Sequence, residues 1–359
     1  MQVPLFATTL EPQMERILER VAEVAHSGRY IFGPELEAFE TEFAGYLGAS
    51  HVIGVGNGTD ALTIALRAAG VKPGDEVICP SFTFYATAES IVNAGALPVF
   101  CDVDPDTYCV TADTVRPHLG ERTAAIVPVH LFGNVAPVAE LRELGVPVIE
   151  DAAQAAGATL DGAKAGTLGD AATFSFFPSK NLPCMGDGGA IVTSSDELAE
   201  QARLLRFHGS RDKRTHTAVG FNSRLDAIQA ATLRVLLPEL DGWNARRRAA
   251  ADAYAAGGLS DIVRLPQPTA GAEHVYHLYT VRADDPDELV ERLGAQGVQA
   301  RVHYRTPAHR QPAMTRFAGA ELPVTEQLAQ SNVALPMGPE LTAEQAAAVV
   351  EACRVRVSA

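Results

Sequence analysis

The sequence lacks an apolar run long enough to cross a membrane. A transmembrane helix needs about 20 consecutive apolar residues, whereas the apolar runs in this chain are interrupted within about ten. The first residues, Met1-Gln-Val-Pro-Leu-Phe6, also lack the basic segment followed by an apolar one that marks a secretory signal. These absences predict a cytoplasmic protein with no membrane partner.

Paired cysteines are absent as well. The five cysteines are odd in number, lie scattered along the chain and form no Cys-x-x-Cys pair: Cys79, Cys101, Cys109, Cys184 and Cys353. This distribution argues for reduced thiols in the cytoplasm and against a structural zinc site, so no metal is expected.

Positive charge is scarce. The chain has 29 Lys and Arg residues against 44 Asp and Glu residues, which gives a net charge of −15. A nucleic-acid-binding protein needs a basic face to contact phosphates, so general nucleic-acid binding is not expected. A local basic pocket for a small phosphorylated ligand is still compatible with this composition.

The length of the chain predicts two domains. The sequence has 359 residues, 47% of them hydrophobic, and a mean hydropathy of +0.03, which is typical of a globular protein. The Gly257-Gly258 step is the strongest boundary signal. We expect a large domain at 1–257, with N-terminal helices, a central sheet and a long connecting helix, and a smaller α+β domain at 258–359.

From residue 51 onward, short β patterns alternate with helical ones. Such alternation predicts a mostly parallel sheet between helices, here with seven strands. The strands are expected at 51–55, 76–80, 97–102, 124–129, 147–151, 172–177 and 190–193. Helices are expected at 11–25, 34–47, 59–69, 86–94, 111–118, 135–144 and 196–206, and in a tract from 227 to 254 that is broken at Pro238. The C-terminal part should add strands at 277–282 and 298–303 around a helix at 286–296.

The stretch from Ala171 to Ile191 carries the first candidate for chemistry. A nearly all-apolar strand ends at Pro178, and Lys180 follows two residues later. A lysine held among apolar neighbours is partly desolvated, which lowers its pKa and favours the neutral amine that attacks carbonyl groups. The alternative is an ordinary surface lysine in a β-turn.

A glycine-rich turn, Gly54-Val-Gly-Asn-Gly-Thr-Asp60, joins the first strand to a helix. Unpaired N–H groups and the positive end of a helix dipole at such a turn suit a phosphate, and Thr59 could add a hydroxyl. The alternative is a plain strand-to-helix turn with Thr59 as the N-cap. The turn is not a Walker loop, and it lacks the third glycine of the dinucleotide fingerprint.

Three further side chains fall on the same edge of the predicted sheet. Asp151 ends a parallel strand, where open α/β sheets bind ligands, and could keep a ligand ring nitrogen protonated. Its alternative role is to cap the next helix. His130 and Phe84 follow neighbouring strands, and Phe84 could stack on a planar ring, although core or turn roles are the alternatives.

Together, a phosphate cup, an aromatic ring, a carboxylate and a desolvated lysine on one sheet edge describe a site for pyridoxal 5'-phosphate (PLP). The lysine would hold the cofactor aldehyde as a Schiff base, and the carboxylate would make the ring an electron sink.

Several motifs, in the order in which they occur, resemble those of a known protein family. The matching segments are Gly28–Pro34, Gly56–Leu62, Pro80–Phe84, Glu150–Gln154, Ser175–Leu182, Gly186–Gly189 and Gly220–Asp226. From about Pro4 to its end, the chain resembles the DegT/StrS family of PLP-dependent nucleotide-sugar aminotransferases. The resemblance implies the aspartate aminotransferase fold, which is fold type I of the PLP-dependent transferases.

The resemblance also implies roles for individual residues. Lys180 would be the catalytic lysine bound to the cofactor, with Asp151 at the pyridine nitrogen. The other implied cofactor contacts are Gln154 near the ring hydroxyl, Phe84 stacked on the ring, Gly58, Thr59 and Ser175 at the phosphate, and Asn222 from the partner subunit of a homodimer with shared active sites. The implied sugar-site residues are Tyr30, Arg224, His303 and Tyr304.

Two departures from the family pattern concern sugar recognition. Pro183 stands where many relatives have glycine, and Arg305 stands where a proline often follows the His-Tyr pair. They leave the expected cofactor chemistry unchanged.

The implied reaction is a ping-pong transfer by way of pyridoxamine phosphate. An amino acid, expected to be L-glutamate, would donate the amino group to a keto group at C3 or C4 of a nucleotide-linked deoxysugar. A PLP-dependent dehydratase or lyase is one alternative, although relatives of the dehydratase branch carry histidine where this chain has Lys180. A non-catalytic regulator on the same fold is the other.

Overall fold

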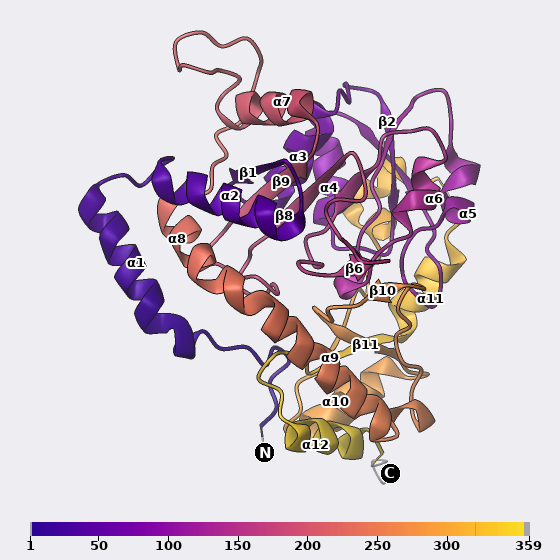
Figure 1. Ribbon diagram of the computed structural model, residues 1–359. Helices are drawn as coiled ribbons and strands as arrows, with labels where there is room; N and C mark the ends of the chain where they lie inside the picture. Colours follow the sequence, from indigo (N-terminus) through magenta and orange to yellow (C-terminus); the bar gives the residue numbers. More distant parts are fainter. Residues whose placement is uncertain (1, 320, 355–359) are drawn as a thin grey trace.

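A twisted sheet at the centre of the molecule holds the strands predicted from residue 51 onward (Figure 1). The computed structural model describes residues 2–319 and 321–354, so the end of the predicted C-terminal domain, 355–359, lies outside the described residues. One half of the sheet has the order β1 (His51–Val55), β9 (Gly189–Thr193), β8 (Ala171–Ser175), β5 (Ile149–Asp151). The other half has the order β3 (Leu97–Cys101), β2 (Glu76–Pro80), β4 (Thr123–Ile126).

Two parallel bridges, Ile126 to Val148 and Val129 to Asp151, join the halves into one seven-stranded sheet. Only β9 runs antiparallel to its neighbours, β1 and β8. The prediction of a mostly parallel seven-stranded sheet is therefore confirmed.

Helices cover both faces of this sheet. They are α1 (Met14–Ser27), α2 (Pro34–Leu47), α3 (Gly58–Ala68), α4 (Ala86–Asn93), α5 (Ala112–Val115), α6 (Val138–Arg142), α7 (Asp196–Arg206), α8 (Ala227–Leu236) and α9 (Leu240–Ala256). Adjacent strand residues point to opposite faces. Val52 and Val192 accordingly join the core under α2 and α8, while Ile53 and Ile191 join the core under α3 and α7. Burial on both faces explains why these strands are apolar throughout.

An aromatic cluster holds β8 against α2. Phe174 of β8 meets Phe43 edge-to-face with ring centroids 5.2 Å apart, and Phe176 meets Phe39 in the same way at 5.4 Å. All four side chains are fully buried. Such pairs add stability beyond the area that they bury, so the strand that leads to Lys180 is anchored firmly.

The tract after Asp226 bends where the sequence predicted. α8 ends at Leu236, a single 3₁₀ turn (Leu237–Glu239) contains Pro238, and α9 then continues to Ala256. Proline lacks the N–H that a helix interior requires, which accounts for the interruption. In Figure 1, α8 and α9 lead from the central sheet to the C-terminal part of the chain.

The C-terminal part has its own sheet, in the order β11 (Tyr279–Arg282), β13 (Asn332–Leu335), β12 (Arg301–Val302). Its helices are α10 (Pro286–Ala295), α11 (Pro323–Ser331) and α12 (Ala343–Arg354). A small sheet of β10 (Ala272–Glu273), β6 (Thr159–Leu160) and β7 (Ala163–Lys164) links the two parts of the chain. The domain boundary at Gly257-Gly258 stays a prediction.

The beginning of the chain packs on this C-terminal sheet. Val3 bridges Val298 in parallel and is buried in the same core as Tyr254 of α9 and Val333 of β13. Val298 forms a separate bridge to Val3, and residues 299–300 lie outside the ladder. β12 is therefore shorter than the strand predicted at 298–303. No helix in the described ranges, 2–319 and 321–354, is long and apolar enough to span a membrane.

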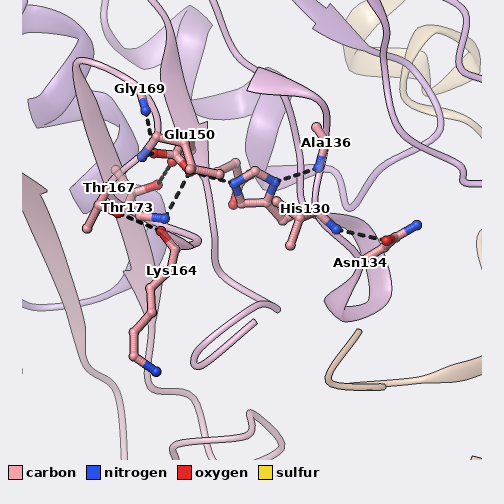
Figure 2. Close-up of polar contacts among 12 residues, drawn as sticks. His130, Asn134, Ala136, Glu150, Lys164, Thr167, Gly169 and Thr173 are labelled. Carbon is pink, nitrogen blue, oxygen red and sulfur yellow. Dashed lines mark hydrogen bonds and ion pairs between the residues drawn. The ribbon is translucent and has the colours of Figure 1, made fainter. Parts of the chain in front are cut away.

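A buried hydrogen-bonded pair, His130 and Glu150, stabilises the junction of the two half-sheets (Figure 2). The Glu150 carboxylate is completely buried and accepts hydrogen bonds from His130 Nε2 at 2.7 Å and from the backbone N–H groups of Gly166, Leu168 and Gly169 at 2.7–2.9 Å. His130 Nδ1 accepts a hydrogen bond from the N–H of Ala136 at 3.0 Å, so the imidazole proton sits on Nε2 and points at Glu150. His130 therefore has a core role.

We predict that Glu150→Ala lowers the free energy of unfolding by about 3–5 kcal/mol, because the change leaves the buried His130 ring and three backbone donors without an acceptor. Urea denaturation followed by circular dichroism measures this loss. The control is Glu143→Ala at an exposed position, which should cost less than about 0.5 kcal/mol. Equal midpoints for the two variants would contradict the structural role of Glu150.

Candidate active site

A cavity of about 330 Å³ opens at the carboxyl ends of β5 and β8. It is lined by nine of the residues that the sequence singled out: Gly58, Thr59, Phe84, Asp151, Gln154, Ser175, Lys180, His303 and Tyr304. These residues come from five separate segments of the chain, so the fold brings together groups that are far apart in sequence.

Lys180 stands in the turn that follows β8. Its backbone N–H donates to the carbonyl of Phe177 at 2.8 Å, which fixes the turn. Lys180 is partly exposed to the cavity. Protein atoms nevertheless surround its amine, and the resulting desolvation lowers its pKa from 10.5 to about 8. Asp151 opposes this effect and raises the pKa, but burial is the larger cause. A neutral amine is therefore readily available near neutral pH.

The N-terminus of α3 forms the second wall. Asn57 is the N-cap, and its side chain accepts from the N–H of Asp60 at 2.8 Å, so the alternative that made Thr59 the cap is wrong. In the part of the chain that the structure describes, the N–H groups of Gly58 and Thr59 have no protein acceptor. Free donors at a helix N-terminus are suited to an anion.

Two glycines let β8 and β9 approach this helix end. A Cβ added at Gly58 would lie 2.8 Å from Ser175 Cβ, and a Cβ added at Gly189 would lie 2.5 Å from the carbonyl carbon of Asn57. Glycine is thus required at both positions because backbone and side chain come into direct contact. The approach places the Ser175 hydroxyl beside the free N–H groups.

Asp151 lines the same cavity as Lys180 and lies close enough to act on its charge. Its Oδ2 accepts from the Thr87 hydroxyl at 2.8 Å, and its Oδ1 accepts from the N–H of Ala153 at 3.2 Å. The residues after Asp151 form turns and no helix, so the alternative role of capping a helix does not apply. Thr87 in turn pairs with Thr83 at 3.0 Å, which fixes the carboxylate from behind.

An aromatic wall completes the cavity. Gln154 accepts from the N–H of Phe132 at 2.7 Å and donates to the Tyr304 hydroxyl at 3.1 Å. Burial raises the pKa of Tyr304 to about 12, so its hydroxyl keeps its proton. Phe84 lies at the mouth, 57% exposed, with its ring centroid 6.1 Å from that of Tyr304. An exposed phenylalanine beside a cavity has room to stack on a ligand.

Three of the predicted site residues do not line this cavity. Tyr30 is half exposed and donates its hydroxyl to the carbonyl of Ala25 at 3.1 Å. Arg224 lies over the ring of Phe32 at 6.0 Å, and Asn222 is exposed. Their roles at a cofactor or sugar site stay predictions.

Sequence reasoning missed several lining residues, of which Phe6, Thr87 and His277 contribute most. Thr87 is the second residue of α4, three residues after Phe84, and could have been found from that spacing. Phe6 belongs to the N-terminal segment and His277 to the residues before β11, and no local pattern connects either of them to Lys180.

The residues present fit PLP. The unpaired N–H groups of Gly58 and Thr59 and the hydroxyl of Ser175 would hold a phosphate, the carboxylate of Asp151 would accept the pyridine N–H, and the amine of Lys180 would meet the aldehyde. The fit rests on chemically matched groups that surround a single cavity.

Comparisons with known proteins agree with this arrangement. The model of the DegT/DnrJ/EryC1/StrS aminotransferase family matches residues 12–354. The chain is 47% identical to a pleiotropic regulatory protein of Geobacillus stearothermophilus, over 95% of this chain and 94% of that one. It is 46% identical to the dTDP-3-amino-3,4,6-trideoxy-alpha-D-glucose transaminase of Streptomyces venezuelae, over 93% of this chain and 90% of that one.

Solved structures agree in fold. The crystal structure of S. venezuelae DesV in complex with a ketimine intermediate superposes with a TM-score of 0.96 at 43% identity, over 99% of this chain and 100% of that one. NtdA from Bacillus subtilis, with bound cofactor PMP, gives a TM-score of 0.90 at 32% identity, over 98% of this chain and 84% of that one. The expected fold is thereby confirmed, and the chain belongs to the DegT/DnrJ/EryC1/StrS aminotransferase family.

Proposed function

We propose that this protein is a PLP-dependent aminotransferase that moves an amino group from L-glutamate to a keto group of a nucleotide-linked deoxysugar. The observation that carries the proposal is a lysine with a pKa lowered to about 8 and a carboxylate, Asp151, in one cavity with a free helix N-terminus. Family membership supports the reaction class, and the cofactor PMP of the B. subtilis structure supports the cofactor.

The bound cofactor supplies an aldehyde that accepts an amino group and a ring that delocalises the carbanion formed at the donor Cα. Gly58, Thr59 and Ser175 would hold its phosphate, Asp151 would hold its ring nitrogen, and Phe84 would pack on the ring. The Lys180 amine acts as the general base: it takes the proton from the donor Cα and later returns a proton to the sugar. Both half-reactions use the same cavity, so we propose ping-pong kinetics.

The name of the S. venezuelae relative supports a dTDP-linked sugar that is aminated at C3 as the first acceptor to test. A panel of C3- and C4-keto sugar nucleotides, offered with L-glutamate and coupled to 2-oxoglutarate detection, tests the proposal. Turnover with at least one member is expected. Absence of turnover with the whole panel, together with no formation of pyridoxamine phosphate from glutamate, would overturn it and favour a dehydratase or lyase.

A regulator is the second candidate, because the G. stearothermophilus relative is a pleiotropic regulatory protein. In this chain Lys180, Asp151 and Ser175 are all retained and all line the cavity. A regulator would need no desolvated amine opposite a carboxylate. We therefore propose catalysis as the primary activity.

We propose further that the protein acts as a cytoplasmic homodimer with shared sites. Tyr30, Ile31, Phe177 and Met185 expose 45–51% of their surface, so each could contribute apolar area to an interface with a second copy. Phe177 also lines the cavity. A second copy of the chain would bury these side chains, and the partner's Asn222 would reach the cofactor phosphate. The described cysteines are all buried and free, which suits a reducing compartment.

We predict that Lys180→Ala lowers kcat by at least ~10³-fold, because the variant loses the amine that we propose moves the proton at the donor Cα. PLP binding should persist through the phosphate contacts and can be followed by absorbance. The matched control is Lys164→Ala, whose ammonium lies 4.1 Å from the centroid of the Tyr46 ring, outside the cavity. Robust transamination by the Lys180 variant would rule out the assignment.

Mixing two inactive variants tests the shared site. Lys180→Ala and Asn222→Ala chains, once exchanged, should form some dimers in which one site carries both lesions and the other site carries neither. Activity should then recover to part of the wild-type level. If subunit exchange is confirmed by mass spectrometry and no activity returns, each chain builds its site alone.

A further inference from the structure

His277 stands in the cavity wall just before β11. It is 3% exposed and lines the same cavity as Lys180. The backbone on both sides of it is fixed, since Val275 donates to the carbonyl of Gly133 at 2.9 Å and Leu278 donates to the carbonyl of Phe132 at 3.3 Å. The imidazole is thus held in place by the same loop that positions Gln154.

The ring of His277 has no hydrogen-bond partner among the described residues, and its Nδ1 is completely buried. Other buried histidines are paired: His130 uses both ring nitrogens, His274 Nδ1 accepts from the N–H of Tyr276 at 2.8 Å, and His309 pairs with Ser81 and Glu326. Nε2 also has no partner among the described residues but is not buried in this way, so it is the ring nitrogen through which His277 can meet a ligand in the cavity.

The charged groups around His277 are all basic. Burial is the main reason that the pKa of His277 lies well below 6.5. The charges of Lys180, Arg247 and His303 lower it further. Arg247 of α9 is 1% exposed, donates to the carbonyl of Tyr276 at 3.0 Å, and forms no ion pair within the described residues. His303 Nε2 and Arg247 Nε also lack partners. This part of the cavity thus offers neutral imidazole nitrogens that can donate a hydrogen bond, with the Arg247 guanidinium close to His277.

We propose that His277 binds the α-carboxylate of the amino-acid donor by donating a ring N–H to one of its oxygens. The inference rests on the proposed aminotransferase function and specifies how the donor is oriented. The α-carboxylate is bonded to the Cα whose proton Lys180 removes, so it must lie close to the Lys180 amine. The phosphates of a sugar nucleotide are several bonds away from the keto carbon. Of the two substrates, only the amino acid brings an anion to this wall.

The test compares His277→Leu, which removes the donor group, with His277→Asn, which keeps an N–H donor. His277→Leu should raise the KM for L-glutamate by about 10–100-fold, as expected for a lost hydrogen bond to a charged group, while the KM for the keto-sugar nucleotide changes little. His277→Asn should fall between wild type and His277→Leu. His274→Asn is the control, because it alters a buried histidine three residues away that does not line the cavity.

Two further measurements distinguish a contact with the α-carboxylate from a contact with the sugar nucleotide or with the side chain of the donor. Calorimetry of the holoenzyme with glutarate, a dicarboxylate that cannot react, should show weaker binding in His277→Leu than in wild type or His274→Asn. In L-isoglutamine an amide replaces the α-carboxylate. Wild type and His277→Leu should therefore have similar KM values for it. An unchanged KM for glutamate with unchanged glutarate binding would overturn the proposal, as would an effect confined to the sugar nucleotide.

These outcomes are distinct from failure of the proposed function. If wild-type protein transaminates no substrate, the function is wrong, and glutarate binding still decides whether His277 contacts a carboxylate. If wild-type protein is active and the His277 variants match it with glutamate, the function stands and the inference fails. Should His277→Leu fold poorly, the comparison of His277→Asn with wild type, on both L-glutamate and L-isoglutamine, carries the test.

Discussion

The site depends on a desolvated amine that faces a carboxylate. Burial at the end of β8 lowers the pKa of Lys180 to about 8 against the opposing charge of Asp151, which makes the neutral amine about 3 kcal/mol more favourable than it is in water. The sheet supplies this environment. The aromatic cluster of Phe43 and Phe174 anchors β8, and the close approach of Gly189 brings the α3 N-terminus to the same place.

Contacts of β5 and of the loop after His130 hold the wall of the cavity that contains Asp151 and Gln154. Glu150 and Asp151 are adjacent on β5 and point to opposite faces, as strand residues do. Glu150 fixes His130 and the turn at Gly166–Gly169, while Asp151 and Gln154 face the cavity. The loop after His130 holds Gln154 through Phe132 and holds the His277 segment through Gly133. The buried pair shown in Figure 2 thus supports groups on two sides of the cavity.

The sequence contained enough information to predict the central sheet and most of the cavity. Strands buried on both faces read as continuous apolar runs, and the ends of neighbouring parallel strands meet at one edge, which is why Asp151, Ser175 and Lys180 could be placed together. The cap of α3 was less predictable, because Asn57 and Thr59 are both good N-cap residues and only the backbone conformation selects Asn57.

Contacts between distant segments could not be predicted. Phe6 reaches the cavity because the N-terminal segment bridges the C-terminal part of the chain, at Phe6 with Met337. His277 reaches it because its segment bonds to Phe132 and Gly133. No local periodicity encodes such pairings. Tyr30, Asn222 and Arg224 were inferred from resemblance and lie outside the cavity of their own chain. Their roles stay predictions, and the role of Asn222 is expected from a second copy of the protein, which a single sequence does not describe.

The central claim is that Lys180 is the residue that binds the cofactor aldehyde. The most direct measurement is reduction of the PLP-loaded protein with borohydride, followed by proteolysis and mass mapping of the modified peptide. The account predicts a single pyridoxyl group on Lys180, although Lys72, Lys164 and Lys213 offer competing amines. A pyridoxyl group on one of those lysines, or no stable adduct at all, would contradict it.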